Sequence, residues 1–407
     1  MLGADSPASL RRLVVFFATV YGVQGVAEPQ AGLATQPLFF LLKEEMRLSA
    51  SETATFFALI GVAWTVKPLY GLLSDAIPLW GSRRRSYLLV TTTMAALGWL
   101  ALGVLPIYPW GAMLVILGLT GLGFAFTDVL CDAVMVEEGK ARGLTGRFQS
   151  IQWAAIYGAS LLAGVGGGYL SAHVAYSHVF LLVALFPALS FAASAWAVHE
   201  PPTRFDRAGA QETVAALRRG LRSGPLWRAA AFIFLWNFSP SFGVPLEFHM
   251  VDNLGISKMQ LGILTSLGSG ASTVGALAFG RYATRLPLRR LLNVAVALGV
   301  AGTLAYYGLV GWWSAVALSL TVDFATAIAL LATLDLAARA VPSHAEGTFF
   351  AALMSVSNLG SSGGEWLGGQ LYDLIGLPWL IAASAATTAA CWLLVPWMRI
   401  PAPPATA

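Results

Sequence analysis

The sequence has few charged residues and few cysteines, and both shortages exclude classes of protein. Only 11% of its 407 residues are charged, whereas a soluble globular protein carries about 25%. Because 57% of the residues are hydrophobic, the chain cannot cover a surface that faces water, and we expect a lipid bilayer to surround it. Cys131 and Cys391 both fall within long apolar stretches, so we expect buried packing residues and no structural disulfide.

Motifs of soluble enzymes are also missing. No GxxxxGK[ST] phosphate-binding loop occurs, which argues against ATP-driven transport by this chain. The five histidines lack the spacing of a metal site, and we expect no cofactor and no bound metal. A cleavable signal peptide is not evident, because Arg11 and Arg12 precede an apolar stretch that is too long for one.

Twelve apolar stretches are each long enough, at about 20 residues, to cross a bilayer. Each is predicted to be a helix, because an open strand in lipid would leave its backbone groups unpaired. The alternating pattern of a transmembrane β-barrel is absent. The predicted spans, numbered 1 to 12, are 12–40, 53–74, 86–105, 110–136, 147–170, 177–197, 227–250, 258–280, 288–308, 312–336, 346–371 and 376–397.

The basic residues predict the orientation of these spans. Of the 24 lysines and arginines, all but Lys43, Arg47, Lys67 and Lys258 lie near the termini or in one alternate set of connections. The positive-inside rule places that set, with both termini, in the cytoplasm. The net charge of +4 reflects this asymmetry, so we expect a multi-pass protein of the cell (inner) membrane and no nucleic-acid partner.

A long polar segment separates six spans from six. It runs HEPPTRFDRAGAQETVAALRRGLRSGP over residues 199–225, and residues 211–222 are expected to form a short amphipathic helix. We therefore predict an N-terminal bundle over 1–198, a cytoplasmic linker over 199–225 and a C-terminal bundle over 226–407. This all-α arrangement of two six-helix bundles resembles the plan of the major facilitator superfamily.

Ionisable residues inside the spans cost roughly 2.5–3.5 kcal/mol each on insertion scales, so each is a candidate for function. Asp128 and Asp132 are four residues apart and share one helix face, which suits uptake and release of a proton. Lys67 is expected at a similar depth and to pair with Asp128 or Asp132, either within the site or only to neutralise a charge. The other intramembrane candidates are Glu28, Asp323 and Glu365, whereas Asp75, Glu137, Glu247 and Asp335 lie nearer span ends, where contact with water is expected.

Some aromatic and amide side chains lie near these charges or near helix breaks. They are Trp153 and Tyr157 in span 5, and Trp236 and Asn237 in span 7. Span 7 continues NFSPSFGVPLEFH, and its prolines and glycine are expected to interrupt the helix, as in many transporter cavities. The glycine runs GVGGGYL and GSSGGEWLGG are expected mainly to let helices approach closely.

Four segments resemble the folate–biopterin transporter family, a branch of the major facilitator superfamily. The first is KPLYGLLSDAIPLWGSRRRSYLLV, which carries Gly71, Asp75, Gly81, Arg83, Arg84 and Arg85. The second is VQGVAE in span 1. The third, TDVLCDAVMVEEGKARGLTGRFQSIQW, carries the gating and loop candidates Glu137, Arg147 and Gln149. The fourth, AEGTFFAALMSVSNLGSSGGEWLGG, carries the loop candidate Glu346 and Asn358, a candidate for binding the substrate or a proton.

The first segment combines a gate and a topology anchor. We expect Asp75 to latch the cytoplasmic side through charge pairs, and the three arginines to hold the loop in the cytoplasm, a role that topology alone explains. The sequence departs from the family at Trp64 and Val66, before Lys67, and at Phe148, where the family often has leucine.

The resemblance implies a monomeric secondary transporter that takes up a folate- or pterin-type organic compound by alternating access, coupled to a proton or another cation. One alternative is a facilitator of the same fold for another solute, such as a nucleoside-like or acyl-conjugate metabolite. A second is a non-transporting membrane sensor or scaffold. We expect no enzyme activity, because the outward connections are short and the inward charges are mostly basic.

Overall fold

The computed structural model describes residues 7–202, 221–282, 286–341 and 346–398, and every regular element in these ranges is a helix. Nine stretches of this described part are helical, long and apolar enough to cross a membrane, and one of them, 348–397, covers the last two predicted spans. Helices also occupy predicted spans 5 and 7. The all-α fold is confirmed, while the expected helix over 211–222 lies largely outside the described residues.

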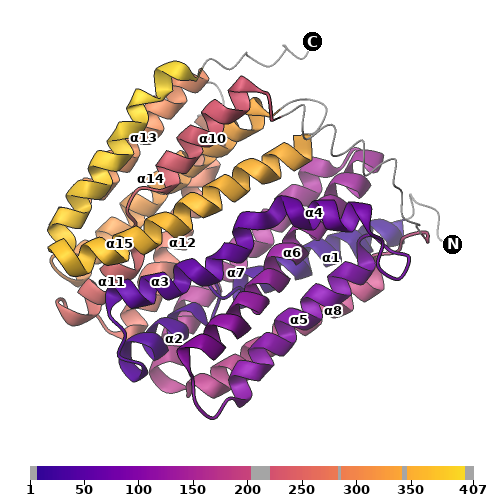
Figure 1. Ribbon diagram of the computed structural model, residues 1–407, viewed down its shortest axis with the longest axis horizontal. Coiled ribbons are helices and arrows are strands. Elements are labelled where there is room, and N and C mark those ends of the chain that lie inside the picture. The colour runs from indigo at the N-terminus through magenta and orange to yellow at the C-terminus, as the bar shows by residue number, and fades with distance from the viewer. Residues whose placement is uncertain (1–6, 203–220, 283–285, 342–345, 399–407) are drawn as a thin grey trace. The chain divides into compact units, whose positions relative to one another are not determined.

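The chain divides into two compact units, and unit 1 contains residues 1–41 and 66–211. Its described helices are α1 (Pro7–Ala27), α2 (Thr35–Phe40), α4 (Lys67–Ala76), α5 (Arg85–Val104), α6 (Trp110–Arg142), α7 (Thr145–His173) and α8 (Tyr176–Ala197). Helix α1 packs on α7 and α8, and α5 packs on α6 and α8 (Figure 1). Buried phenylalanines such as Phe17 and Phe148 join α1 to α7, with ring centroids 4.9 Å apart.

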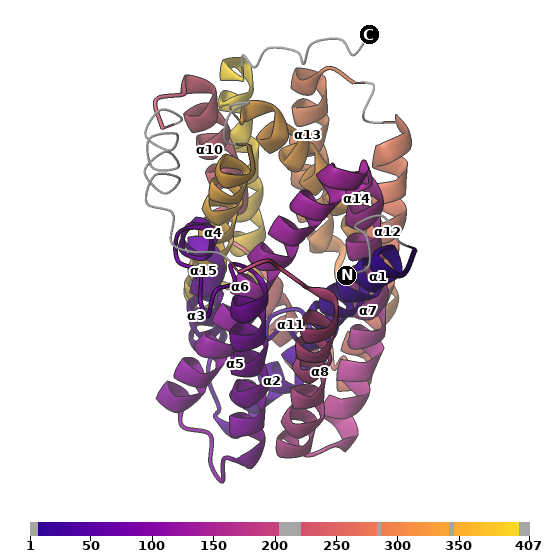
Figure 2. The ribbon, with the colours of Figure 1, turned by 90° about the vertical axis from the view of Figure 1, so that its right-hand side faces the viewer.

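Unit 2 contains residues 42–65 and 212–407. Its described helices are α3 (Ala50–Ile60), α10 (Gly224–Asn237), α11 (Gly243–Asp252), α12 (Lys258–Tyr282), α13 (Leu288–Ala305), α14 (Trp312–Ala340) and α15 (Glu346–Ala390). Helix α12 packs along α14 (Figure 2), and α15 packs on α3, α10 and α13. Helix α15 comprises two spans that meet at Gly376, whose φ of +73° is a left-handed conformation that glycine adopts without strain.

Three spans are interrupted. Span 1 breaks between α1 and α2, next to Pro29, and span 7 breaks between α10 and α11, as its prolines predicted. Span 2 is also broken, because a 3₁₀ segment, Gly61–Val66, separates α3 from α4. The sequence had indicated one continuous helix over residues 53–74. Breaks of this kind occur in membranes only where the protein itself satisfies the freed backbone groups.

The break in span 2 coincides with a division between the units. Residues 42–65 cluster with unit 2, whereas Val66 and the residues after it cluster with unit 1. Helix α3 is held closely against α15, because a Cβ built on Gly369 would lie 2.6 Å from the Cβ of Ala54 and 3.0 Å from the Cα of Ser51. One predicted span therefore contributes its two halves to two different packing units.

The glycine run of α15 receives the broken part of span 7. The backbone N–H of Ser241 donates to the carbonyl of Gly364 at 2.9 Å. A Cβ on Gly368 would lie 1.6 Å from the carbonyl oxygen of Ser241, and a Cβ on Gly364 would lie 2.7 Å from that of Ser239. The packing role expected for this run is confirmed, because only glycine allows such an approach.

Large apolar side chains cover much of the outer surface. Leu69, Leu162, Leu185, Leu277 and Trp313 are all exposed. Exposed apolar side chains in this number are unfavourable in water and favourable in hydrocarbon. The chain is therefore a multi-pass membrane protein.

Replacing Gly368 by alanine should destabilise unit 2, because the added methyl group meets the backbone of Ser241. We expect a loss of about 1–3 kcal/mol, typical of overpacking, measured as a lower Tm of the purified protein in detergent. Gly118 of α6 is the matched control, since a Cβ there meets nothing within 4 Å. Gly118→Ala should leave the Tm unchanged or raise it, and equal effects of the two substitutions would contradict the packing argument.

Candidate functional site

An ion pair joins α4 to α6 in unit 1. The Nζ of Lys67 lies 2.6 Å from Oδ2 of Asp128, and the two side chains are only 16% and 8% exposed. Lys67 is the first residue of α4, where the helix dipole disfavours a cation. The nearby carboxylate offsets both that dipole and the loss of hydration. The pairing of Lys67 with Asp128 that the sequence predicted is present.

Asp132 lies one helical turn beyond Asp128 and has a different environment. Its Oδ1 accepts a hydrogen bond from the hydroxyl of Tyr21 at 2.6 Å, and its side chain reaches solvent, whereas Asp128 is buried. Among the described residues, the ion pair of this cluster is made by Asp128 and not by Asp132. The two carboxylates therefore share a helix face, but Asp132 is the more exposed of the two and accepts a hydrogen bond from a neutral donor.

Helix α7 completes this part of unit 1. The side chain of Gln152 is buried, with Nε2 3.9 Å from Sγ of Cys131, the residue before Asp132. The next residue, Trp153, is exposed and stacks on Tyr157 one turn later, with centroids 5.4 Å apart and planes inclined by 27°. The two aromatic candidates of span 5 thus stack on each other, and their helix contacts α6. Tyr21 and Gln152 were not predicted, although both lie in helices that the family resemblance had marked. VQGVAE begins two residues after Tyr21, and Gln152 lies within the third matched segment.

Glu28 lies where span 1 breaks. It is 6% exposed, and its Oε2 accepts a hydrogen bond from the backbone N–H of Gln30 at 2.7 Å. The indole of Trp99 donates to the carbonyl of Ala27, at the end of α1, at 2.8 Å. The carboxylate of Glu28 therefore helps to satisfy the backbone of the break.

Arg84 forms the centre of a second cluster in unit 1. Its Nη2 lies 2.6 Å from Oδ1 of Asp75 and 2.6 Å from Oε1 of Glu137, and its Nη1 donates to Oγ of Ser74 at 2.8 Å. Burial alone would lower the pKa of this guanidinium, but the charges of Asp75 and Glu137 outweigh it and raise the pKa. The cytoplasmic orientation of the loop therefore does not by itself explain Arg84. This side chain is buried and crosslinks α4, the loop and α6.

The loop before α5 is held by a residue that the sequence analysis did not identify. A carboxylate oxygen of Glu200 accepts hydrogen bonds from the hydroxyl of Ser82 and from the backbone N–H of Arg84, the latter at 3.0 Å. Trp80 and Gly81 both have positive φ, and Leu79 and Ser82 exchange two backbone hydrogen bonds around them. This is a tight turn with a left-handed conformation at both central positions, which glycine adopts readily at Gly81 and which Trp80 also adopts.

The remaining predicted loop residues are more peripheral. Arg85 donates from Nη2 to the carbonyl of Ala195 at 3.2 Å, and Gly71 is half-buried with Val129 as its nearest neighbour. The others are Arg83, which is half-buried, Arg147 and Gln149, which are exposed at the start of α7, and Glu346, whose side chain lies outside the described part.

Unit 2 contains its own acidic groups. Asp323 of α14 packs directly over Gly268 of α12, since a Cβ on that glycine would lie 2.0 Å from Oδ2 of Asp323. Glu365 of α15 is half-buried and close enough to Glu247 of α11 to interact electrostatically. Glu247 is half-buried beside another carboxylate, so its interpretation as a residue that simply reaches water at a span end was incomplete.

The aromatic and amide candidates of unit 2 make contacts within the protein. Trp236 stacks on Phe232, with centroids 6.4 Å apart. Asn237 donates to the carbonyl of Ile233 at 2.8 Å, and Asn358 donates from Nδ2 to the carbonyl of Trp64 at 2.8 Å. The amide donor of Asn358 is therefore occupied by span 2.

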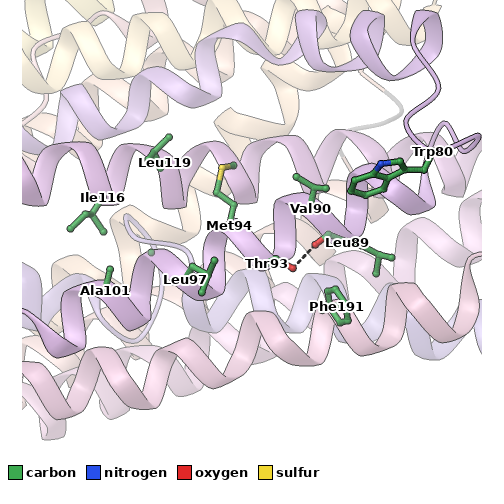
Figure 3. A pocket seen from close by; sticks show the side chains of 11 residues that line it. Trp80, Leu89, Val90, Thr93, Met94, Leu97, Ala101, Ile116, Leu119 and Phe191 are labelled. Atoms are coloured by element: carbon green, nitrogen blue, oxygen red, sulfur yellow. Dashed lines mark hydrogen bonds between the residues drawn. The ribbon is translucent and has the colours of Figure 1, made fainter.

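A large groove of about 700 Å³ lies on the apolar surface of unit 1 (Figure 3). It is lined by side chains of α5, α6 and α8 such as Met94, Leu97, Leu119 and Phe191, together with Trp80. The hydroxyl of Thr93 donates to the carbonyl of Leu89 in its own helix at 2.7 Å. The groove offers a polar solute almost no hydrogen-bonding groups, and it contains none of the ionisable candidates.

Sequence comparison matches residues 24–380 to the BT1 family. A folate-biopterin transporter of Synechocystis is 30% identical over 372 residues, covering 86% of this chain and 74% of the relative. A probable folate-biopterin transporter 4 of Arabidopsis thaliana is 24% identical and covers 83% of this chain and 84% of the relative. Folate transporter 1 of Plasmodium falciparum is 20% identical, with 81% and 67% covered.

Solved structures agree on the fold. A mutant of the nucleoside transporter NupG superposes with a TM-score of 0.75 at 11% identity, covering 96% of this chain and 100% of that one. A D-xylose–proton symporter superposes with a TM-score of 0.68 at 14% identity, with 97% of each chain covered. At these identities the likeness concerns the fold alone, and it agrees with the all-helical fold class predicted from the sequence.

Removing one partner of the Lys67–Asp128 pair should leave a buried charge uncompensated. We expect Lys67→Met to destabilise the protein by about 3–5 kcal/mol, measured as a lower Tm in detergent. The double variant Lys67→Met/Asp128→Leu should recover most of that loss, because no buried charge remains. Two losses that simply add would contradict a direct pair.

Proposed function

This chain belongs to the BT1 family, and from that premise we propose that it takes up folate- or pterin-type compounds by proton-coupled alternating access. Family and fold together identify a membrane transporter. Three relatives are named as folate or folate-biopterin transporters, which supports the substrate class. We further propose that both termini are cytoplasmic and that bundles over 1–198 and 226–407 alternate access.

The observation that carries the coupling proposal is the contrast between two carboxylates on one face of α6. Asp128 is fixed by Lys67 at 2.6 Å, so its charge is already compensated. Asp132 reaches solvent and accepts a neutral hydrogen bond from Tyr21. An exposed carboxylate that forms no ion pair within the described part of the chain is suited to bind a proton and release it. Asp132 is therefore the proposed proton site.

The same region has groups that suit a pterin ring. A carboxylate can accept two hydrogen bonds from the N–H groups on the 2-amino-4-oxo edge of a pterin. Trp153 is exposed and already stacks on Tyr157, and an aromatic face of this kind favours a flat heteroaromatic ligand. Gln152 brings this part of α7 against α6 next to Asp132. Proton and substrate would then bind to neighbouring groups, which is a simple basis for coupling them.

Neutralising Asp132 should separate accumulation from exchange. In proteoliposomes with an acidic exterior, we expect the native protein to accumulate labelled folic acid and a protonophore to abolish this accumulation. Asp132→Asn should reduce gradient-driven accumulation at least tenfold and retain exchange of internal for external folic acid, because only proton release is lost. Glu45→Gln, at an exposed carboxylate of the same chain, should behave like the native protein.

The same assay separates the alternatives. Accumulation that is unaffected by the protonophore and by Asp132→Asn would overturn proton coupling. Competition by nucleosides or acyl conjugates but not by pterins would indicate a facilitator with another substrate. No flux of any of these solutes would favour a sensor or scaffold.

A further inference from the structure

The break in span 2 occurs immediately before Lys67, and a proline in the sequence explains it. In a continuous α-helix the carbonyl of Trp64 would accept a hydrogen bond from the N–H of residue 68. Residue 68 is proline, which has no N–H. The chain instead forms the 3₁₀ segment Gly61–Val66, and α4 begins at Lys67. The sequence thus frees one backbone carbonyl three residues before the lysine of the ion pair.

Asn358 supplies the missing donor. Its Nδ2 lies 2.8 Å from the carbonyl oxygen of Trp64, and both residues are only partly exposed. A side-chain amide therefore replaces the hydrogen bond that Pro68 cannot donate. In the low-dielectric interior of a membrane protein, a freed carbonyl needs such a partner.

Other contacts hold the segment that leads into span 2 against the rest of unit 2. The Nζ of Lys43 lies 2.6 Å from Oδ2 of Asp252, and the Nζ of Lys258 lies 2.5 Å from Oε2 of Glu44. The N–H of Ser51, near the start of α3, donates to Asp373 of α15 at 3.1 Å. Unit 2 thus holds residues 43 to 64 at several points, and the hydrogen bond to Trp64 is the last of them before Lys67.

We propose that Asn358 is a positioning residue that sets the location of Lys67 through the carbonyl of Trp64. Lys67 is bound to Asp128 of unit 1, while the backbone three residues earlier is held by α15 of unit 2. Three residues span at most about 10 Å when extended, so a shift of the Trp64 carbonyl is transmitted to Lys67. Where this inference concerns transport rates, it rests on the proposed function.

Three substitutions test this role in proteoliposomes with labelled folic acid as the probe. Asn358→Ala should lower the maximal uptake rate at least fivefold and change KM less than twofold, because Asn358 does not touch the substrate. Adding Pro68→Ala, which restores an N–H at residue 68, should recover at least half of the lost rate. Asn358→Asp should transport better relative to the native protein at low pH, where the protonated carboxyl can donate, than at high pH, where it cannot.

A second measurement needs no transport. In detergent, Asn358→Ala should lower the Tm by about 2–4 °C, and in the Pro68→Ala background the same substitution should lower it by less than half as much. Ser357→Ala, at the preceding position of α15, should leave the Tm unchanged. This cycle reports on the hydrogen bond even if the protein does not carry folic acid, so failure of the proposed substrate and failure of the positioning role are distinguishable.

Two outcomes would overturn the inference. A large rise in KM for Asn358→Ala with no recovery by Pro68→Ala would place Asn358 in direct contact with the substrate. Additive Tm losses for Asn358→Ala and Pro68→Ala would show that the amide and the N–H of residue 68 do not serve the same carbonyl. If Pro68→Ala alone abolishes uptake, the Tm values of the two single variants and of the double variant decide whether the amide and the N–H serve the same carbonyl.

Discussion

The ion pair between Lys67 and Asp128 lies where both side chains are largely shielded from solvent, at 16% and 8% exposed. An uncompensated lysine or aspartate there would destabilise the fold by several kcal/mol, so the positions of α4 and α6 in unit 1 depend on the pair. Because Lys67 also begins α4, the pair fixes the point at which span 2 resumes its helix. The proposed proton site at Asp132 lies one turn away, on the same face of α6.

The three broken spans follow one physical rule. Each break lies near proline and frees backbone groups, and in each case the protein supplies partners for them. Glu28 accepts from Gln30 in span 1, Asn358 donates to Trp64 in span 2, and Gly364 accepts from Ser241 in span 7. Non-helical backbone at membrane depth is stable only under this condition. An ionisable side chain, Glu28, Lys67 or Glu247, lies at or near each break, so the interruptions and the costly charges occur together.

Part of the site could be predicted because it depends on local rules. Asp128 and Asp132 had to share a face because they are four residues apart, and similar depth in the bilayer made Lys67 a plausible partner. The break in span 7 followed from Pro240, Gly243 and Pro245. The role of Arg84 could not be predicted in full, because a cluster of arginines at a cytoplasmic loop is already explained by orientation. Only packing shows that one of the three is buried between Asp75 and Glu137.

By itself the sequence determined that the chain lies in a bilayer and that its regular elements are helices, since charge content, apolar length and backbone pairing in lipid allow few alternatives. It also contained the motifs that link the chain to its family. The tertiary structure decided which carboxylate receives the lysine, that Tyr21 bonds the other one, and that the first half of span 2 packs with unit 2. These outcomes depend on contacts between residues such as Trp64 and Asn358, nearly 300 positions apart, and helical periodicity sets only the face on which a side chain lies, not the partner that it meets there.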